Sequence, residues 1–205
     1  MAIRLYSWPR SSGTRVHWAL EELGLPYEYV ELDRQKGEHR APDYLAVNPN
    51  AKVPAIADGD ERLFESVAIL IHLGERYGVA KGLWPKDGPA HADALSWIVW
   101  STTELHAFMM QYAYHGLDTP VSYKAEDRSK AAADYNKHNF DRHLDMLEAR
   151  LAGRQFIMGD FSLVDIPAAA TLRFGSMIGV SLDGKPNVAA WLERCTKRPA
   201  VARTR

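Results

Sequence analysis

The pattern of apolar and polar positions divides the chain into two zones. Up to about Gly78, short apolar runs alternate with stretches whose apolar residues recur at helical spacing. The pattern predicts four strands, at Ile3–Ser7, Tyr27–Leu32, Val53–Ala57 and Arg62–Phe64. It predicts helices at Thr14–Leu23, between the first two strands, and at Ser66–Tyr77, after the fourth, with a loop at Asp33–Pro42. Two strands around one short helix favour a parallel pair joined by a right-handed crossover.

Strand signals nearly vanish after a stretch rich in Gly, Pro and Lys. Ala90–Tyr114 and Glu126–Leu151 have long helical patterns, and "FSLVDIPAAATLRF" and "NVAAWLERCTKR" predict two more helices. The fold class is therefore α/β plus all-α. We expect an α/β domain over residues 1–78, a linker over 79–89 and an all-helical domain over 90–205.

The composition excludes some classes of partner and site but does not indicate a function. The 205 residues are 46% hydrophobic and 25% charged, with a formal net charge of -1. No basic stripe indicates nucleic acid, and no apolar run indicates a membrane span or a signal peptide. The single cysteine, Cys195, excludes an internal disulfide and a cysteine-based metal site. We expect a soluble cytoplasmic protein that holds no metal.

Two serines follow the first strand, in "SSGTR" at Ser11–Arg15. Serine is a preferred helix N-cap, so the sequence favours capping when this motif is taken alone. A helix N-terminus also offers free N–H groups and a positive dipole end, where a bound thiol would lose its proton more readily. A hydroxyl that donates to the sulfur would stabilise the thiolate further. A hydrolase triad is less favoured, because the "GxSxG" elbow is absent.

A second motif is "NPNAKVP" at Asn48–Pro54. Pro54 stands where an apolar strand begins, and a proline in such a corner is a candidate for a cis peptide bond. A cis bond would leave the Val53 backbone open to pair with a peptide ligand as an added strand would. A plain turn is the alternative.

A third motif places Glu65 and Ser66 at the start of a helix. Ser66 can serve as a cap and Glu65 as an exposed charge. The same groups can also hold a ligand: Ser66 and the free N–H groups bind a carboxylate, while Glu65 pairs with an amino group. Together they would bind the α-amino acid end of a ligand.

The order and spacing of these motifs resemble those of the glutathione S-transferase family, in its serine-type theta, zeta and delta-like members. The matching segments are "SSGTR", "NPNAKVPAI", "ESVAILIHLGERYG" and "FIMGDFSLVDI", which span nearly the whole chain. The resemblance implies a thioredoxin-like domain that binds glutathione, followed by a helical bundle with a hydrophobic substrate site. It also implies a homodimer.

The resemblance implies roles for individual residues. The catalytic hydroxyl is expected from Ser11, four residues before Arg15, then from Ser12, and third from Tyr6 at the end of the first strand. For glutathione, the resemblance implies that the Val53 backbone pairs with the cysteinyl part, beside cis Pro54. It implies that Glu65 and Ser66 hold the γ-glutamyl end. Lys52 and His39 are expected to contact the glycyl carboxylate or nearby backbone. If one serine caps the helix, Ser12 is the better cap, because it lies nearer the helix.

An aromatic and methionine-rich stretch, "LHAFMMQYAYHG", covers Leu105–Gly116. Such stripes usually belong to a core or a dimer interface. The resemblance places this helix beside the hydrophobic substrate site, which Phe108, Met109, Tyr112 and His115 would then line. Methionine suits a site of loose shape.

The leading hypothesis is a glutathione transferase that presents the thiolate to a hydrophobic electrophile, with peroxidase activity as an addition. One alternative is a glutathione-dependent isomerase of the zeta type, although the cysteine typical after the two serines is Gly13 here. Another is a non-catalytic binding module of the same fold. Glutathione is the expected co-substrate, and no nucleic-acid or membrane partner is expected.

Overall fold

The computed structural model describes residues 2–204 and divides the chain into two compact units. The first unit contains the chain up to His91 and again from Arg198, and the second contains Ala92–Lys197. The stretch 79–89, predicted as a linker, therefore belongs to the first unit. Trp84 in this stretch is buried against Gly74, where an added Cβ would lie 2.5 Å from the Trp84 ring.

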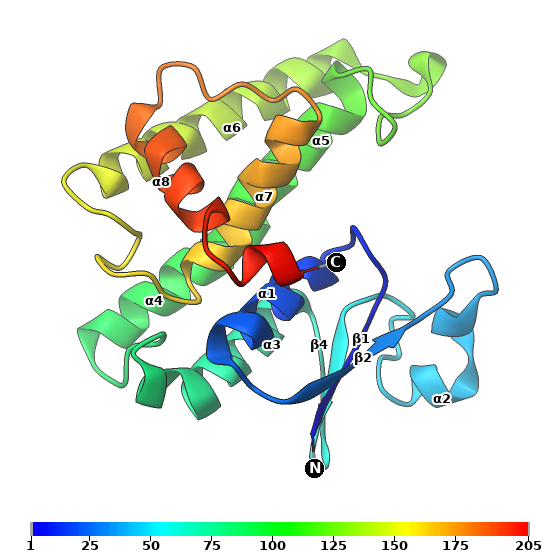
Figure 1. Cartoon of the computed structure of the whole chain (residues 1–205). Coiled ribbons are helices and arrows are strands. Elements are labelled where there is room, and N and C mark those ends of the chain that lie inside the picture. Colours follow the sequence, from blue (N-terminus) through cyan, green and yellow to red (C-terminus); the bar gives the residue numbers. More distant parts are fainter. Residues whose placement is uncertain (1, 205) are drawn as a thin grey trace. The chain divides into compact units, whose positions relative to one another are not determined.

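Four strands form the sheet of the first unit: β1 (Ile3–Ser7), β2 (Tyr27–Glu31), β3 (Ala55–Asp58) and β4 (Glu61–Phe64), in the order β2-β1-β3-β4 (Figure 1). The pairing of β1 with β2 is parallel, as the sequence predicts, and the other two pairings are antiparallel. Leu5 lies between Tyr29 and Ile56 in the register and is fully buried.

Helices cover the sheet of the first unit. The helices α1 (Gly13–Leu23) and α3 (Ser66–Leu73) pack against each other and bury Leu20, Ile69 and Leu70. The short helix α2 (Pro42–Leu45) brings Tyr44 against Tyr6 of β1, with 5.8 Å between ring centroids. A 3₁₀ turn at Glu38–Arg40 lies within the predicted loop, and α2 begins at the last residue of that loop, Pro42.

The second unit is helical, as predicted. It contains α4 (Pro89–Trp100, whose first turn belongs to the other unit), α5 (Ala107–Gly116), α6 (Lys130–Leu151), α7 (Asp165–Met177) and α8 (Pro186–Thr196). A π-helical segment at Ser101–His106 interrupts the predicted 90–114 helix. The second long helix begins at Lys130 rather than Glu126, because the Ser129 hydroxyl caps it by accepting the Ala132 N–H at 3.2 Å.

The segment from Arg198 returns to helix α1 of the first unit, although the sequence predicts it in the helical domain. The Arg198 guanidinium binds both carboxylate oxygens of Glu22 at 2.7 Å, and Glu22 also accepts the Trp18 indole N–H at 2.9 Å. Arg203, in the 3₁₀ turn Val201–Arg203, pairs with Glu21. Across residues 2–204, the structure contains no helix that is both long and apolar enough to cross a membrane.

Candidate active site

The loop between β1 and α1 fixes the Ser11 hydroxyl. This hydroxyl donates to the Trp8 carbonyl at 2.7 Å, accepts the Gly13 N–H at 3.1 Å and lies 3.0 Å from the Ser7 hydroxyl. Ser11 therefore satisfies one of the free N–H groups at the start of α1. A hydroxyl that accepts an N–H keeps its own proton available to a ligand that displaces the Trp8 carbonyl.

The prediction that Ser12 is the better cap is wrong. Ser12 makes no side-chain capping bond, because its own backbone is already in the helical region, with φ -60° and ψ -14°. Its exposed hydroxyl instead donates to the Val53 carbonyl at 3.1 Å. Ser12 thus connects the serine loop to the second motif.

Gly13 is required by close packing inside the serine loop. A Cβ at this position would lie 1.9 Å from the Ser7 Oγ and 3.1 Å from the Ser11 Oγ. Real Cβ atoms do not approach another atom as closely as 1.9 Å, so any side chain would displace Ser7 and crowd the Ser11 hydroxyl. The loop therefore excludes the cysteine that zeta-type members place there.

The peptide bond between Val53 and Pro54 is cis, as predicted. The carbonyl of the preceding residue, Lys52, accepts two hydrogen bonds, from the Tyr44 hydroxyl at 2.5 Å and from the Asn48 side-chain amide at 2.6 Å. Pro54 is buried, Val53 is half-buried, and the Lys52 side chain is exposed. The backbone around Val53 is thus held by its neighbours on both sides.

The third motif is joined to helix α1 by a buried contact. The Arg15 guanidinium donates to the Ser66 hydroxyl at 3.3 Å, and both side chains are buried. Burial lowers the pKa of Arg15 to about 10, so the guanidinium stays charged at neutral pH. Glu65, just before α3, has a positive φ of 68° and an exposed side chain. Positive φ is uncommon for a residue with a side chain and is frequent at ligand sites.

His39 and Tyr6 are the two further candidates of the first unit. His39 packs edge-on against Trp8, with 5.6 Å between ring centroids, and its Nδ1 atom is buried without a hydrogen-bond partner among the described residues. Tyr6 alternates with buried Ser7 along β1, and its ring packs on the cluster of Leu32, Tyr44 and Ala55. Tyr6 therefore lies on the α2 side of the sheet, which separates it from the Ser7–Ser11 pair.

The four residues expected at the hydrophobic site have different positions in the second unit. Met109 is fully buried and would contact a Cβ at Gly175, so it belongs to the core and not to an accessible site. Phe108 stacks on His143, with ring centroids 5.3 Å apart. Tyr112 and His115 do line a cavity of about 720 Å³ between α5 and α6. The rest of its lining is mostly polar and includes Arg128, Lys130, Lys137 and His138.

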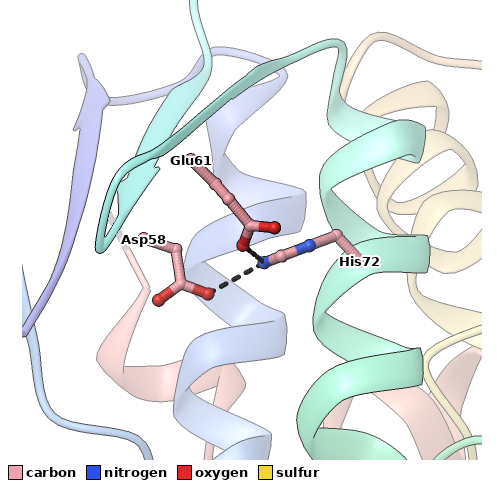
Figure 2. A group of neighbouring side chains, drawn as sticks. All are labelled: Asp58, Glu61 and His72. Atoms are coloured by element: carbon pink, nitrogen blue, oxygen red, sulfur yellow. Dashed lines mark hydrogen bonds and ion pairs between the residues drawn. The ribbon is translucent and has the colours of Figure 1, made fainter.

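Asp58, Glu61 and His72 bring three potential metal-ligating atoms within 4.8 Å of one another (Figure 2). The His72 Nε2 atom lies 2.8 Å from Asp58 and 3.7 Å from Glu61. Arg76 already pairs with Glu61, and the Tyr77 hydroxyl reaches both oxygens of Asp58 at 3.0 and 2.9 Å. With these partners the group is a satisfied ion-pair network that joins the β3–β4 hairpin to helix α3.

Asp58→Asn is expected to lower the free energy of unfolding by about 1–3 kcal/mol at pH 7. Burial raises the pKa of the Asp58 carboxyl, but hydrogen bonds from His72 and Tyr77 and the nearby Arg76 charge outweigh it and leave the pKa below its ordinary value. A lowered folded-state pKa stabilises the protein above the unfolded pKa, and this stabilisation is lost as pH falls below about 4. Urea unfolding from pH 7 to pH 3 should therefore show the difference from wild type shrinking. Asp60→Asn, at an exposed position in the turn that follows Asp58, is the control, and an equal effect from both variants would contradict the prediction.

The amino-acid sequence matches the family model described as the N-terminal domain of glutathione S-transferases over residues 1–75, and the C-terminal domain model over residues 104–199. Glutathione S-transferase 3 of Zea mays is 34% identical, over 98% of this chain and 92% of that protein. Glutathione S-transferase GstB of Escherichia coli K12 is also 34% identical, over 95% of this chain and 94% of that protein.

Solved structures agree with these matches. A glutathione transferase from Burkholderia graminis, with two glutathione molecules bound per subunit, has a TM-score of 0.85 and 32% identity, over 98% of this chain and 86% of that one. A theta class enzyme from Xanthomonas axonopodis pv. citri, with glutathione bound, has a TM-score of 0.84 and 28% identity, over 99% of this chain and 96% of that one.

Proposed function

Because this chain belongs to the glutathione S-transferase family, we propose that it is a glutathione transferase whose first unit binds glutathione and activates the thiol as a thiolate for attack on a hydrophobic electrophile. One observation supports this most directly: two hydrogen bonds join the three motifs. Ser12 on the serine loop reaches Val53, and Arg15 on helix α1 reaches Ser66. The three motifs therefore lie together within one unit, which supports a single binding site for glutathione.

We propose that each part of glutathione has its own partner. The Val53 backbone pairs with the cysteinyl residue as an added strand would. The exposed Glu65 carboxylate binds the γ-glutamyl amino group, and Ser66 with the first N–H groups of α3 binds the γ-glutamyl carboxylate. We assign Lys52 and His39 to the glycyl carboxylate; the His39 Nδ1 atom, which has no partner among the described residues, supports a polar ligand there.

Ser11 is the proposed partner of the sulfur. The N-terminus of α1 carries a partial positive charge, which favours an anion at this end of the helix. The N–H of Gly13 donates to the Ser11 hydroxyl oxygen and polarises the hydroxyl. The Ser11 hydroxyl proton can then turn from the Trp8 carbonyl to the thiolate. The helix N-terminus and the Ser11 hydroxyl both stabilise the thiolate relative to the thiol, so more of the bound glutathione is nucleophilic at neutral pH.

Ser66→Ala is expected to raise the Kd for glutathione about tenfold or more, because a hydrogen bond to a charged group contributes roughly 1.5–3 kcal/mol. Ser66 accepts from Arg15, so its own proton remains for the γ-glutamyl carboxylate. Calorimetry of wild type and variant measures the change, with circular dichroism as the check on folding. Ser176→Ala, in the second unit, is the control, because within residues 2–204 that hydroxyl bonds to the Leu172 carbonyl of its own helix and to nothing in the first unit. Unchanged affinity in a folded Ser66→Ala protein would remove Ser66 from the site.

Reduction of organic peroxides is the second candidate activity. It consumes two glutathione molecules for each peroxide, and two of the solved relatives hold two glutathione molecules. Turnover of an aryl halide, an organic peroxide and a cis-dienone isomerase substrate, measured side by side, separates the candidate reactions. We expect isomerase turnover to be the weakest, because Gly13 replaces the cysteine of the zeta type. Retention on glutathione agarose without turnover of any substrate would indicate the non-catalytic module.

We also propose a homodimer, in the cytoplasm, on the basis of the family. At micromolar concentration, light scattering is expected to give about twice the 23.1 kDa mass of one chain. A particle of one chain's mass across that range would contradict the dimer. The cytoplasm is proposed because a reduced glutathione pool supplies the co-substrate there.

A further inference from the structure

We infer that Tyr44 and Asn48 are positioning residues for glutathione, which act by fixing the Lys52 carbonyl and, through it, the backbone of Val53. The inference rests on the proposed function, since it assigns a role within the same site. Asn48 is the first residue of the second motif and Tyr44 lies outside all three motifs, but no direct contact with glutathione is assigned to either. Their contribution is to hold the surface on which the cysteinyl residue pairs.

The geometry is a two-donor clamp on one oxygen. The Tyr44 hydroxyl and the Asn48 Nδ2 atom lie 2.5 and 2.6 Å from the Lys52 carbonyl oxygen. A carbonyl oxygen has two lone pairs, so these donors saturate it. Tyr44 is 4% exposed and Asn48 is 2% exposed, so water does not compete for the oxygen from their side.

Both donors are themselves held in place. The Asn48 Oδ1 atom accepts the Asn50 N–H at 2.9 Å, which fixes the amide so that its Nδ2 faces Lys52. Tyr44 packs among Leu32 and Ala55, with Tyr6 against its ring. Burial raises the pKa of Tyr44 to about 12, so the hydroxyl remains a donor throughout the physiological range.

The orientation of the Lys52–Val53 peptide group connects the two donors to the proposed ligand. The peptide bond between Lys52 and Val53 is trans, so its C=O and N–H point in opposite directions. With the Lys52 carbonyl drawn toward Tyr44 and Asn48, the Val53 N–H points away from that buried cluster. The Val53 carbonyl is in turn bound by the Ser12 hydroxyl at 3.1 Å. Both polar groups of Val53 are therefore fixed in orientation before the ligand arrives, which lowers the entropic cost of binding.

The test compares wild type, Tyr44→Phe, Asn48→Ala and the double variant by calorimetry with glutathione and with S-methylglutathione, which has no free thiol. We expect each single variant to raise both Kd values about threefold to tenfold. The double variant should exceed the product of the single effects, because each donor partly compensates for loss of the other on the shared oxygen. Tyr27→Phe is the matched control: it removes a tyrosine hydroxyl of the same unit that bonds to Glu21 and His17 instead.

A purely structural role predicts a different result. It would lower the melting temperature of the variants while the folded protein kept its affinity, whereas positioning raises KM for glutathione and leaves kcat at saturation within about threefold. If the double variant does not fold, Tyr44→Phe alone decides, because phenylalanine fills the same space. Unchanged affinity in folded Tyr44→Phe and Asn48→Ala overturns the clamp. Wild type that binds neither ligand overturns the proposed function itself, so the two failures are distinguishable.

Discussion

Asp165→Ala is expected to lower the free energy of unfolding of the second unit by about 3 kcal/mol or more. The carboxylate is fully buried and accepts the N–H of Ile157 at 2.9 Å, the N–H of Ser162 at 3.0 Å and the indole N–H of Trp191 at 2.8 Å. Without it, these three buried N–H groups lose their acceptor, as does the Ser162 hydroxyl, which donates to Asp165 at 3.3 Å; each unsatisfied donor costs about 1–3 kcal/mol. Urea unfolding, followed by tryptophan fluorescence, measures the change.

Asp160→Ala is the matched control, because Asp160 is exposed and only five residues away. Its effect should stay within about 0.5 kcal/mol. Similar midpoints for Asp165→Ala and wild type would show that these contacts contribute little to stability. Just before α7, the Ser162 N–H and hydroxyl both donate to Asp165, at 3.0 and 3.3 Å, and the Ser162 hydroxyl accepts the Val164 N–H at 3.3 Å.

Ser11→Ala is expected to reduce conjugation about tenfold to a hundredfold at pH 7. Loss of a donor to an anion, at roughly 1.5–3 kcal/mol, should raise the pKa of the bound glutathione thiol by about one to two pH units. Part of the activity should return as pH rises, when solution hydroxide removes the proton instead. Thiolate absorbance of bound glutathione against pH measures the pKa directly, and Ser11→Thr, which keeps a hydroxyl, should retain most of the activity.

Ser12→Ala is the companion variant. Because Ser12 binds the Val53 carbonyl and not the helix, we expect a modest rise in the Kd for glutathione, about twofold to fivefold, with an unchanged thiol pKa. If Ser12→Ala shifts the thiol pKa and Ser11→Ala does not, the two hydroxyls have the opposite roles. If neither variant shifts it, Tyr6 or backbone N–H groups stabilise the thiolate, and the hydroxyl mechanism is wrong.

Local patterns carry most of what could be predicted about the fold. The alternation of buried and exposed side chains along Ile3–Ser7 is a property of one strand, so five consecutive residues are enough to predict it. The cis bond before Pro54 follows from a proline at a strand corner. The order and spacing of the three motifs then indicate the family, which neither composition nor periodicity does.

Features that depend on distant partners could not be predicted in this way. The clamp on Lys52 needs Tyr44 from a helix of only four residues, too short to leave a periodic signal. Methionine is a residue type that suits an adaptable substrate site, so the sequence favours Met109 as a lining residue. Its burial depends on the close approach of Gly175, which lies far away in the sequence. The choice of Ser11 over Ser12 as the cap follows from the backbone angles of Ser12, which its residue type does not reveal.

The return of residues 198–203 to helix α1 has a consequence for the order of events during synthesis. On the ribosome, Glu21 and Glu22 emerge more than 170 residues before Arg198 and Arg203, their partners in the finished protein. Domains usually fold as units as they emerge, the N-terminal one first. Here, helix α1 can acquire these ion pairs only after the whole helical unit has been translated. A nascent chain stalled before Arg198 would therefore expose the acidic end of the helix that carries the serine loop.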